Sequence, residues 1–405
     1  MGAPSSPFAA AAPAPARTTT VATTATSAIL RIHPVSPVGA TRWAHVCQIA
    51  GMPFRIIQHS TGNVGTHALR AIIEHPDLEL VGLWVHSAEK VGRDAGELCG
   101  LPPVGVVATD DVDAILALDA DVVSHNATGD LRPHEAAQEM AALLRSGKNV
   151  VSTSIISLLH PASADRSIVA LLEAACAEGG TSCFTSGIDP GFANDLIPLT
   201  LTGMCSRVDS VRVAEILNYD TYDQPTVLFD TMGFGRPMDH VPFLLMPGVL
   251  SFAWGAVIQL LAEGLGVEVD RVYESYERLP APETFTIDAG TIEAGTVAAL
   301  RFEIVGVVGG EPRLVIEHVT RLRDDLAPDW PTPPGHGGYR IDIVGSPTFH
   351  LDLSMTGENG DHNAGGLLAT AMRLLNAVPA VCAAPPGLLT PFDLPLVTGR
   401  GLMRP

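Results

Sequence analysis

The stretch from Arg55 to Gly65 reads Arg-Ile-Ile-Gln-His-Ser-Thr-Gly-Asn-Val-Gly and constrains the fold more than any other part of the chain. A short apolar run ends there in a turn of small residues. Val64, Ala68 and Ile72 then recur at helical spacing. A strand, a tight glycine turn and a helix in this order are typical of the opening unit of a dinucleotide-binding domain.

The turn itself is predicted to hold the pyrophosphate of the dinucleotide. Gly62 would let the backbone approach the phosphates, and Gly65 would let the helix pack against the strand. The amides at the helix N-terminus would face the phosphate charge. The predicted cofactor-binding residues of this turn are Ser60, Thr61, Gly62, Asn63, Val64 and Gly65. Ser60 stands where the fingerprint normally has its first glycine, so the motif alone is a weak signal.

Short apolar runs alternate with helical patterns through the first half of the chain. Strands are expected near residues 54–58, 79–85, 104–108, 120–125, 149–153 and 181–185. This alternation predicts an α/β fold with a Rossmann-type, doubly wound parallel sheet as the dinucleotide-binding domain, residues 52–190. Ligands of such sheets bind beyond the carboxyl ends of the strands, and the cofactor residues are expected there.

The end of the second strand, Trp84-Val85-His86, carries no acid that could bond the ribose hydroxyls of NAD. The basic residues Lys90 and Arg93 follow soon after. We therefore expect His86, Lys90 and Arg93 to bind the cofactor, which is predicted to be NADP, with NAD possible. The alternative is that Lys90 and Arg93 are solvated surface charges.

The fourth strand ends in a small, polar loop that contains Asn126, Ala127 and Thr128. Such a loop can pass under the cofactor and let the nicotinamide ring approach, and these three residues are predicted to bind the cofactor. The alternative is an ordinary strand-to-helix turn in which Thr128 or Asp130 caps the next helix.

After a turn-rich hinge at residues 186–192, the apolar period changes to two. Alternating segments lie near residues 208–217, 267–277, 285–288, 297–308, 314–322 and 348–354. They predict a second α+β domain with an open, mostly antiparallel sheet, a substrate and oligomerisation domain over residues 191–360. Because the sheet needs cover on its exposed face, a homodimer is expected.

Three further segments complete the expected organisation. Residues 329–338 are read as a Pro/Gly loop without a period. Residues 361–405 are predicted to form a C-terminal helix, capped by Asp361, and a tail that packs back on the cofactor domain and trails through Pro385-Pro386. Residues 1–51 are rich in Ala, Pro, Thr and Ser, with three arginines and no acid. They are predicted to be a disordered extension, with a transit or export signal as the alternative.

Composition limits the function. The chain has 405 residues, which suits two domains, and a formal charge of −20, which argues against a nucleic-acid surface. No uninterrupted apolar run reaches membrane-spanning length. The six cysteines are scattered without a Cys-x-x-Cys pair, so we expect reduced thiols in a cytoplasmic protein. No clustered ligand spacing is seen, and no metal is predicted.

Several polar residues are candidates for chemistry near the hinge. Asp189 and His160 are the predicted catalytic residues, because a half-buried acid or a histidine could move a proton to or from a substrate. Asn194, Tyr219 and Tyr222 are predicted to contact the substrate. The alternative for Asp189 is a turn residue that bonds its own backbone. His318 and His350 lie in strand patterns and are interpreted as core or surface residues.

Three motifs together carry a family resemblance: residues 60–65, Asp189-Pro190-Gly191-Phe192, and Gly360-Asp361-His362-Asn363-Ala364-Gly365-Gly366. From Met52 onward, the chain resembles the dihydrodipicolinate reductase-like oxidoreductases, in the branch of 2,4-diaminopentanoate dehydrogenases and native amine dehydrogenases of actinobacteria. The resemblance implies a dimeric, NAD(P)-dependent enzyme. It would act on a C=N or CH–NH2 (or C=O) centre of a small molecule.

One departure from that branch affects the expected chemistry. The amine dehydrogenases of the family carry an acid just after the fifth strand, but residues 150–160 contain none here. We therefore expect weak reductive amination of simple ketones, restored by Ile155→Glu or Ile156→Glu. The alternative function is a catalytically idle sensor or scaffold that binds a nicotinamide nucleotide.

Overall fold

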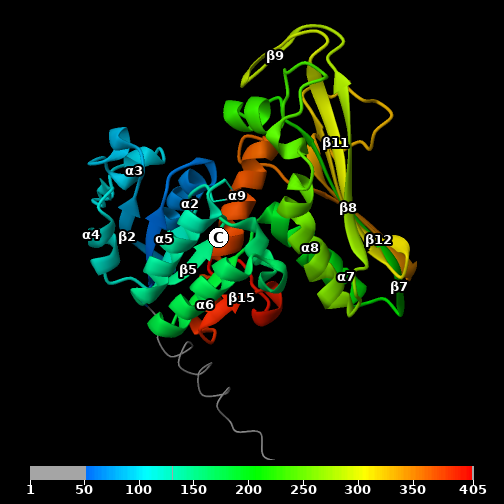
Figure 1. Cartoon of the computed structure of the whole chain (residues 1–405). Coiled ribbons are helices and arrows are strands. Elements are labelled where there is room, and N and C mark those ends of the chain that lie inside the picture. The colour runs from blue at the N-terminus through cyan, green and yellow to red at the C-terminus, as the bar shows by residue number, and fades with distance from the viewer. Residues whose placement is uncertain (1–51, 130, 404–405) are drawn as a thin grey trace, which may run out of the picture.

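The computed structural model describes residues 52–129 and 131–403. They form two domains that lie beside each other in Figure 1. The blue, cyan and green half of the chain builds the first domain, and a large yellow and green sheet marks the second. The predicted disordered extension lies outside the described residues.

The first domain is built on a seven-stranded sheet of order β15-β6-β5-β4-β1-β2-β3, in which every neighbouring pair is parallel. The strands are β1 (Phe54–His59), β2 (Leu78–Trp84), β3 (Ala108–Thr109), β4 (Val122–His125), β5 (Asn149–Ser152), β6 (Ser182–Thr185) and β15 (Gly387–Leu389). The strand order reverses between β1 and β4, which opens a crevice for a ligand there. The predicted Rossmann-type sheet is confirmed.

Helices cover both faces of this sheet. They are α2 (Asn63–Glu74), α3 (Ala95–Leu98), α4 (Val112–Ala117), α5 (Pro133–Arg145), α6 (Arg166–Gly179), α9 (His362–Leu375) and α10 (Val378–Ala383). Val122 and Val123 of β4 point to opposite faces, as successive strand residues do. Val123 joins an apolar cluster with α4, α5 and α6, and Val122 joins one with α2, α9 and α10.

Two sequence-based expectations for this domain are wrong. The third strand covers only Ala108–Thr109 instead of residues 104–108, because the amides of Val104 and Gly105 donate to the Asp94 carboxylate. Those amides are then not available to a neighbouring strand. The chain also does not simply trail away after Pro386. Gly387–Leu389 forms β15, which pairs with β6 at the edge of the sheet.

The second domain is built on a six-stranded sheet of order β14-β13-β7-β12-β11-β8. Its strands are β7 (Arg207–Asn218), β8 (Arg271–Pro280), β11 (Val297–Val308), β12 (Glu311–Arg321), β13 (Gly337–Ser346) and β14 (Phe349–Ser354). Only the β7–β12 pair is parallel among these described strands. The open, mostly antiparallel sheet is confirmed. A small hairpin, β9 (Phe285–Ile287) with β10 (Gly290–Ile292), stands beside it.

Strand β13 is not predicted from the sequence, because residues 329–338 read as a loop and the next alternating segment lies near residues 348–354. Two glycines open the strand, and glycine weakens a strand pattern. Here glycine is required, since a Cβ on Gly338 would lie 2.1 Å from the carbonyl oxygen of Leu353 on β14. The close approach of two strands therefore explains a residue that argues against a strand in the sequence.

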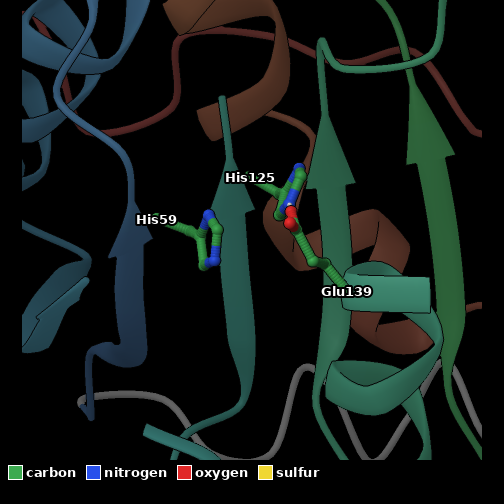
Figure 2. A group of neighbouring side chains, drawn as sticks. All are labelled: His59, His125 and Glu139. Carbon is green, nitrogen blue, oxygen red and sulfur yellow. Dashed lines mark ion pairs between the residues drawn. The ribbon is translucent and has the colours of Figure 1, made fainter. Parts of the chain in front are cut away.

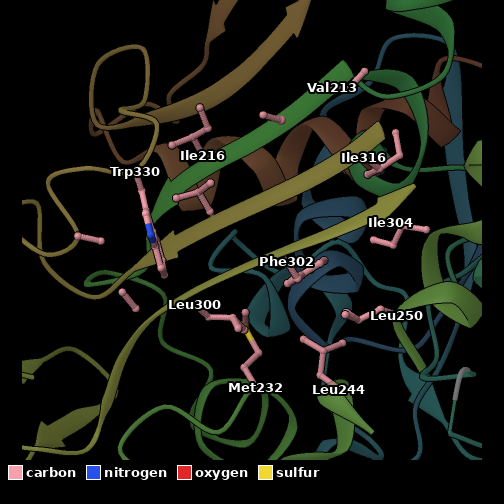
Figure 3. Close-up of a cluster of buried hydrophobic side chains, with 14 of the residues drawn as sticks. Val213, Ile216, Met232, Leu244, Leu250, Leu300, Phe302, Ile304, Ile316 and Trp330 are labelled. Carbon is pink, nitrogen blue, oxygen red and sulfur yellow. The ribbon is translucent and has the colours of Figure 1, made fainter. Parts of the chain in front are cut away.

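Helix α8 (Val249–Leu265) covers one face of the second sheet, and α7 (Leu196–Thr202) leads into it from the hinge. Figure 3 shows Phe302 and Ile304 of β11 in the same buried cluster as Leu250 of α8. Short helical or irregular turns connect the elements: η1 (Ala88–Lys90), η2 (Ile156–Leu159), η3 (Pro161–Ser163), η4 (Ile188–Phe192), η5 (Thr226–Thr231), η6 (Phe243–Leu245) and η7 (Pro391–Asp393).

The C-terminal helices return the chain to the first domain. Asp361 accepts hydrogen bonds from the amides of Asn363 and Ala364, so it caps α9 as predicted. Residues 362–383 are long and apolar enough to cross a membrane by length and composition alone. In the fold they are two helices, and Leu374 and Val378 are fully buried against the parallel sheet. Their packing is that of core helices.

Candidate active site

The glycine turn joins β1 to α2 with the backbone that a dinucleotide fingerprint requires. Ser60 has φ of +80°, in the left-handed region, at the position where the fingerprint normally has glycine. A non-glycine residue there costs about 1–2 kcal/mol. The serine thus adopts the glycine conformation, and the imperfect motif still forms the turn.

The two glycines of the turn have different surroundings. A Cβ on Gly65 would lie 2.4 Å from the Ser60 carbonyl oxygen, so glycine is needed for the helix to pack. A Cβ on Gly62 would meet no heavy atom within 4 Å among the described residues. Gly62 begins α2 without a side-chain cap, which leaves the first amides of the helix for a ligand. This cradle fits a pyrophosphate.

The basic segment after β2 reaches the glycine turn. Lys90 Nζ donates to the carbonyl oxygen of Thr61 at 3.0 Å and to its hydroxyl at 3.1 Å. His86 and Arg93 are exposed on the same segment. The structure therefore brings Lys90 and Thr61 together, and both lie beside the place where the ribose of a bound dinucleotide would run.

The loop after β4 is held in place by hydrogen bonds. Asn126 Oδ1 accepts from Gln58 Nε2 at 3.0 Å and from Ser124 Oγ at 2.9 Å, and its Nδ2 donates to Thr153 Oγ1 at 3.2 Å. Ala127 is buried. Thr128 is exposed and does not cap α5, whose N-cap is Arg132. Asn126 thus ties three strand ends together at the crevice.

A cleft lies where the hinge, the second sheet and α9 meet. Its volume is about 560 Å³, part of it open to solvent. The polar residues that line it are Asp189, Glu215, Tyr219, Tyr222, Tyr339, His362, Asn363 and Thr370, and the apolar ones include Ile188, Leu217, Met355 and Leu367. No lysine or arginine is among these described lining residues.

A continuous chain of polar contacts forms one wall of this cleft. Tyr339 OH donates to Glu215 Oε1 at 2.8 Å, and Glu215 Oε2 lies 3.0 Å from His318 Nδ1. His318 Nε2 lies 3.5 Å from Asp189 Oδ1, which also accepts from Trp254 Nε1 at 2.8 Å. The chain links the hinge, α8 and three strands of the second sheet.

The charge of this wall follows from burial and pairing. Burial alone would lower the pKa of His318, but the Asp189 carboxylate and the Glu215 carboxylate on its two ring nitrogens raise that pKa to about 10. His318 is therefore an imidazolium at neutral pH. Two carboxylates face this one cation, so the wall has a formal excess of one negative charge.

One acceptor in the wall is left over. Asp189 Oδ2 is buried and has no hydrogen-bond partner within residues 52–129 and 131–403, while Asp189 Oδ1 is fully used. An unpaired buried carboxylate oxygen is unfavourable unless a donor approaches it. The wall can accept a hydrogen bond from a cation in the cleft.

Tyr219 and Tyr222 form an aromatic side of the cleft. Their rings stack with centroids 4.5 Å apart. Burial raises the pKa of Tyr219 well above its usual value and that of Tyr222 to about 12, so both are neutral phenols. They offer ring surface and a hydroxyl, not charge, to a substrate.

Comparison with known proteins gives the family. Residues 56–155 match the model of the dihydrodipicolinate reductase N-terminus, and residues 192–403 match that of the 2,4-diaminopentanoate dehydrogenase C-terminal domain. An amine dehydrogenase of Streptomyces virginiae is 44% identical over 340 residues, which cover 83% of this chain and 94% of that protein. The chain belongs to this dehydrogenase family. It is an NAD(P)-dependent oxidoreductase, and the predicted branch is confirmed.

More distant relatives agree. A 2,4-diaminopentanoate dehydrogenase of Acetoanaerobium sticklandii is 23% identical over 354 residues, which cover 84% of this chain and 93% of that protein. The structure of an amine dehydrogenase from Mycobacterium smegmatis superposes with a TM-score of 0.68 at 21% identity, covering 86% of this chain and 98% of that one. At 21% identity, the similarity to the Mycobacterium smegmatis structure shows a shared fold. Membership of this family supports the predicted enzyme over the alternative of a catalytically idle protein that binds a nicotinamide nucleotide.

Two predicted site residues lie away from the cleft wall. His160 Nε2 is 2.8 Å from Glu263 Oε2, and its Nδ1 is 2.8 Å from Ser163 Oγ, so it links the first domain to α8. Asn194 is fully buried and accepts a hydrogen bond from the amide of Gly191, which holds the hinge turn. Neither is among the residues that line the cleft.

Of the two positions suggested for restoring the acid of the family pattern, Ile156 is half-buried, but Ile155 is unsuitable. Ile155 is fully buried in the apolar cluster under α5 and α6. A glutamate there would place an unpaired carboxyl in the core, at a cost of several kcal/mol. The two carboxylates that line the cleft come instead from the hinge, as Asp189, and from β7, as Glu215.

Four residues of the cleft wall were not selected from the sequence: Glu215, Trp254, His318 and Tyr339. His318 and Glu215 lie inside long strand patterns and look like core or surface positions. The structure shows that residues 314–321 are all buried, so His318 must have polar partners. The sequence alone did not show this burial, because residues 314–321 mix polar and apolar side chains.

Proposed function

We propose that this enzyme interconverts an amine and the corresponding imine or ketone in the cleft beside Asp189. The observation that carries this proposal is the excess of negative charge in the cleft wall, with Asp189 Oδ2 left without a donor among the described residues. A cationic nitrogen is the substrate feature that such a wall favours.

The wall suits the charge that develops during the reaction. When bound, the nicotinamide nucleotide supplies or accepts a hydride at the substrate carbon. Loss of that hydride from a neutral amine leaves an iminium cation, and a preorganised negative wall stabilises charge that appears in the transition state. Asp189 Oδ2 can accept a hydrogen bond from the nitrogen and take its proton, which provides general base catalysis.

The lining of the cleft also narrows the substrate class. A carboxylate on the substrate would need a lysine or arginine, and the described lining contains neither. Ile188, Leu217, Met355 and Leu367 provide apolar walls. We therefore infer an amine without a carboxylate next to the reacting carbon, in preference to an amino acid.

NADP is the proposed cofactor, with NAD as the alternative. Lys90 lies against the glycine turn, Arg93 and His86 are exposed beside it, and the end of β2 has no acid. A 2′-phosphate would find basic partners on this edge. We also propose that the enzyme is a homodimer. A cytoplasmic location is proposed because the five cysteines within the described residues are free thiols.

The proposal is tested by following nucleotide reduction with a panel of substrates. We expect oxidation of simple primary amines with NADP+, and little or no oxidation of the α-amino acids with the same side chains. Each amine and its amino acid form a matched pair that differs only in the carboxylate. A preference for the amino acids would contradict the proposal.

A further inference from the structure

Buried polar side chains gather at two places near the crevice, under the glycine turn and at the start of α9. Figure 2 shows the first group, His59, His125 and Glu139. His125 Nε2 and Glu139 Oε2 form an ion pair at 3.5 Å. The His59 ring stacks on the rings of His125 and Trp84, with centroids 4.4 and 4.2 Å apart. None of these side chains lines the cleft, so the first group offers nothing to a substrate there.

The second group gives the cleft another acceptor without a donor. Asn363, near the start of α9, is 6% exposed and lines the cleft. Its Oδ1 is buried and has no hydrogen-bond partner among the residues that the structure describes. Such an oxygen is rare, because its lost contact with water is not replaced. Asn363 Oδ1 and Asp189 Oδ2 are therefore two unsatisfied acceptors on residues of one cleft.

The orientation of the Asn363 amide follows from its neighbours. Nδ2 donates to the carbonyl oxygen of Asn218 at 3.1 Å and to Thr221 Oγ1 at 2.8 Å. Thr221 gives its only hydroxyl hydrogen to Asp361 Oδ1 at 2.8 Å, so its oxygen can only accept from Asn363. The carbonyl oxygen of Asn218 is also purely an acceptor. The amide nitrogen must face these two atoms, which leaves Oδ1 as the uncommitted end.

The surrounding backbone holds this arrangement in place. Asp361 Oδ1 also accepts from the backbone amide of Asn363 at 3.0 Å. His362 Nε2 donates to the same carbonyl oxygen of Asn218 at 2.6 Å. The end of β7 and the start of α9 are thus tied together, and the Asn363 amide cannot turn over without losing both hydrogen bonds of Nδ2.

Hydrogen-bond donors line the same cleft. The hydroxyls of Tyr219 and Tyr222 make no hydrogen bond within the described part of the chain, and both phenols are neutral because burial raises their pKa. An ammonium group has hydrogens for Asn363 Oδ1 but no lone pair to accept from a tyrosine. A hydroxyl group both donates and accepts, so it matches the two kinds of partner.

We propose that Asn363 is a specificity-determining residue, whose Oδ1 accepts a hydrogen bond from a hydroxyl group on the substrate amine. The inference rests on the proposed function, with the reacting nitrogen beside Asp189 and the hydroxyl beside Asn363. The substrate is then an amino alcohol. An alkylamine of the same size leaves Oδ1 unpaired, and a site built to bond a hydroxyl rejects an analogue that lacks it.

The test compares amino alcohols with the alkylamines in which a methyl group replaces the hydroxyl. The pairs are ethanolamine with n-propylamine, and the next two longer amino alcohols with n-butylamine and n-pentylamine. At one chain length we expect kcat/KM to be roughly tenfold or more higher for the amino alcohol. Equal values at every length would mean that a bound water alone satisfies Oδ1. A preference for the diamine of the same length would mean that a second cation binds instead. Either result would overturn the proposal.

Matched variants locate the hydroxyl. Asn363→Leu keeps most of the volume but removes the acceptor, so the ratio within a pair should fall to about one. Because both members of a pair are measured in the same variant, a general loss of activity cancels. Asn376→Leu, at the other end of α9 and outside the cleft lining, is the control and should keep the wild-type ratio. A wild-type ratio in Asn363→Leu would place the hydroxyl elsewhere.

Binding separates this inference from the proposed function. Calorimetry with NADPH present measures the affinity for the same pairs without turnover, because the reduced nucleotide cannot accept a hydride. If amines are oxidised but neither rate nor affinity favours the hydroxyl, this inference fails and the proposed function stands. If Asn363 governs the affinity for amino alcohols and no amine is oxidised, the proposed function fails and the role of Asn363 stands.

Discussion

Asp189 is the single residue on which the proposed chemistry depends most. Its backbone lies in the hinge between the two domains, and its side chain is almost fully buried. Trp254 and His318 use one carboxylate oxygen and leave the other for the cleft. The residue thus connects the hinge geometry to the charge of the substrate site.

We predict that Asp189→Asn lowers the rate of amine oxidation by roughly 10²- to 10⁴-fold, the usual contribution of a general base. The amide keeps an acceptor for Trp254 but removes the negative charge and the proton acceptor. Steady-state rates at saturating amine measure the loss, and circular dichroism with nucleotide titration serves as the control. A variant that oxidises amines at the wild-type rate would exclude Asp189 as the base.

His318 predicts a pH dependence of stability. Its pKa is raised to about 10 in the folded protein, above the unfolded value of about 6.5. The stabilisation from this imidazolium is therefore complete below pH 6.5 and is lost as pH rises from there through 10. Urea unfolding between pH 6 and 10 should show the decline. In His318→Gln the contribution is absent, and an equally steep decline in that variant would contradict the assignment.

At the scale of elements, the two glycines of the β1–turn–α2 unit have different roles, one in the packing of the helix and one in the proposed binding of the cofactor. Gly65 is needed because a Cβ there would meet the Ser60 carbonyl, whereas Gly62 faces open space. Forcing a side chain into a packed position such as that of Gly65 typically lowers the stability of the fold by about 1–3 kcal/mol.

We therefore predict opposite phenotypes for two substitutions. Gly65→Ala should lower the melting temperature, because the helix must shift away from the turn. Gly62→Val should keep the melting temperature of the free protein and abolish nucleotide binding, because its side chain fills the cradle. Thermal unfolding and titration with NADPH measure both. Normal NADPH binding by Gly62→Val would place the cofactor elsewhere.

The segment after β2 is predicted to select the cofactor. One charge-assisted bond contributes about 1.5–3 kcal/mol, roughly tenfold or more in affinity. Replacing Lys90 and Arg93 with alanine should therefore weaken NADPH by at least that factor more than NADH. NADH is the internal control, because it shares every group except the 2′-phosphate. Equal losses would mean that these side chains stabilise the turn, as the Lys90–Thr61 contact also could.

At the scale of the whole molecule, the second sheet has one face packed on α8 and one turned away from it. A row of cross-strand partners runs over the outer face: Arg212 of β7, Val315 of β12, Val305 of β11 and Tyr273 of β8. Tyr273 is 39% exposed, and Arg212 pairs with Glu303 and Glu317 on the same face. Val315 and Val305 are themselves buried, at 7% and 3% exposed, so the surface that this face offers to a second copy related by twofold symmetry consists of Tyr273 and the ion pairs of Arg212.

Light scattering should therefore find a dimer that Tyr273→Glu converts to a monomer. Tyr276→Glu is the matched control, because Tyr276 is similarly exposed on the same strand but pairs with Phe302 of the inner face. A dimer that survives Tyr273→Glu, or that Tyr276→Glu also breaks, would place the interface elsewhere.

The elements that could be predicted from the sequence are those whose signals are local. The glycine turn, the alternation of strands and helices, the period-two segments and the Asp361 cap all depend on residues close together in the chain. These signals were enough to assign both sheets and the family. They failed where pairing partners are distant, as for β13, whose glycines are required by β14, and for β15, which completes the first sheet from the C-terminus.

The chemistry of the cleft could not be predicted in this way, because it depends on contacts between distant segments of the chain. Asp189, Glu215, Trp254 and His318 are far apart in the sequence and meet because the hinge, α8 and two strands converge. No periodicity encodes that meeting, since a strand pattern does not report what His318 faces. The charge of His318 depends in turn on those partners. Sequence patterns report local geometry and burial, whereas pKa values and ligand preference arise from contacts between distant segments.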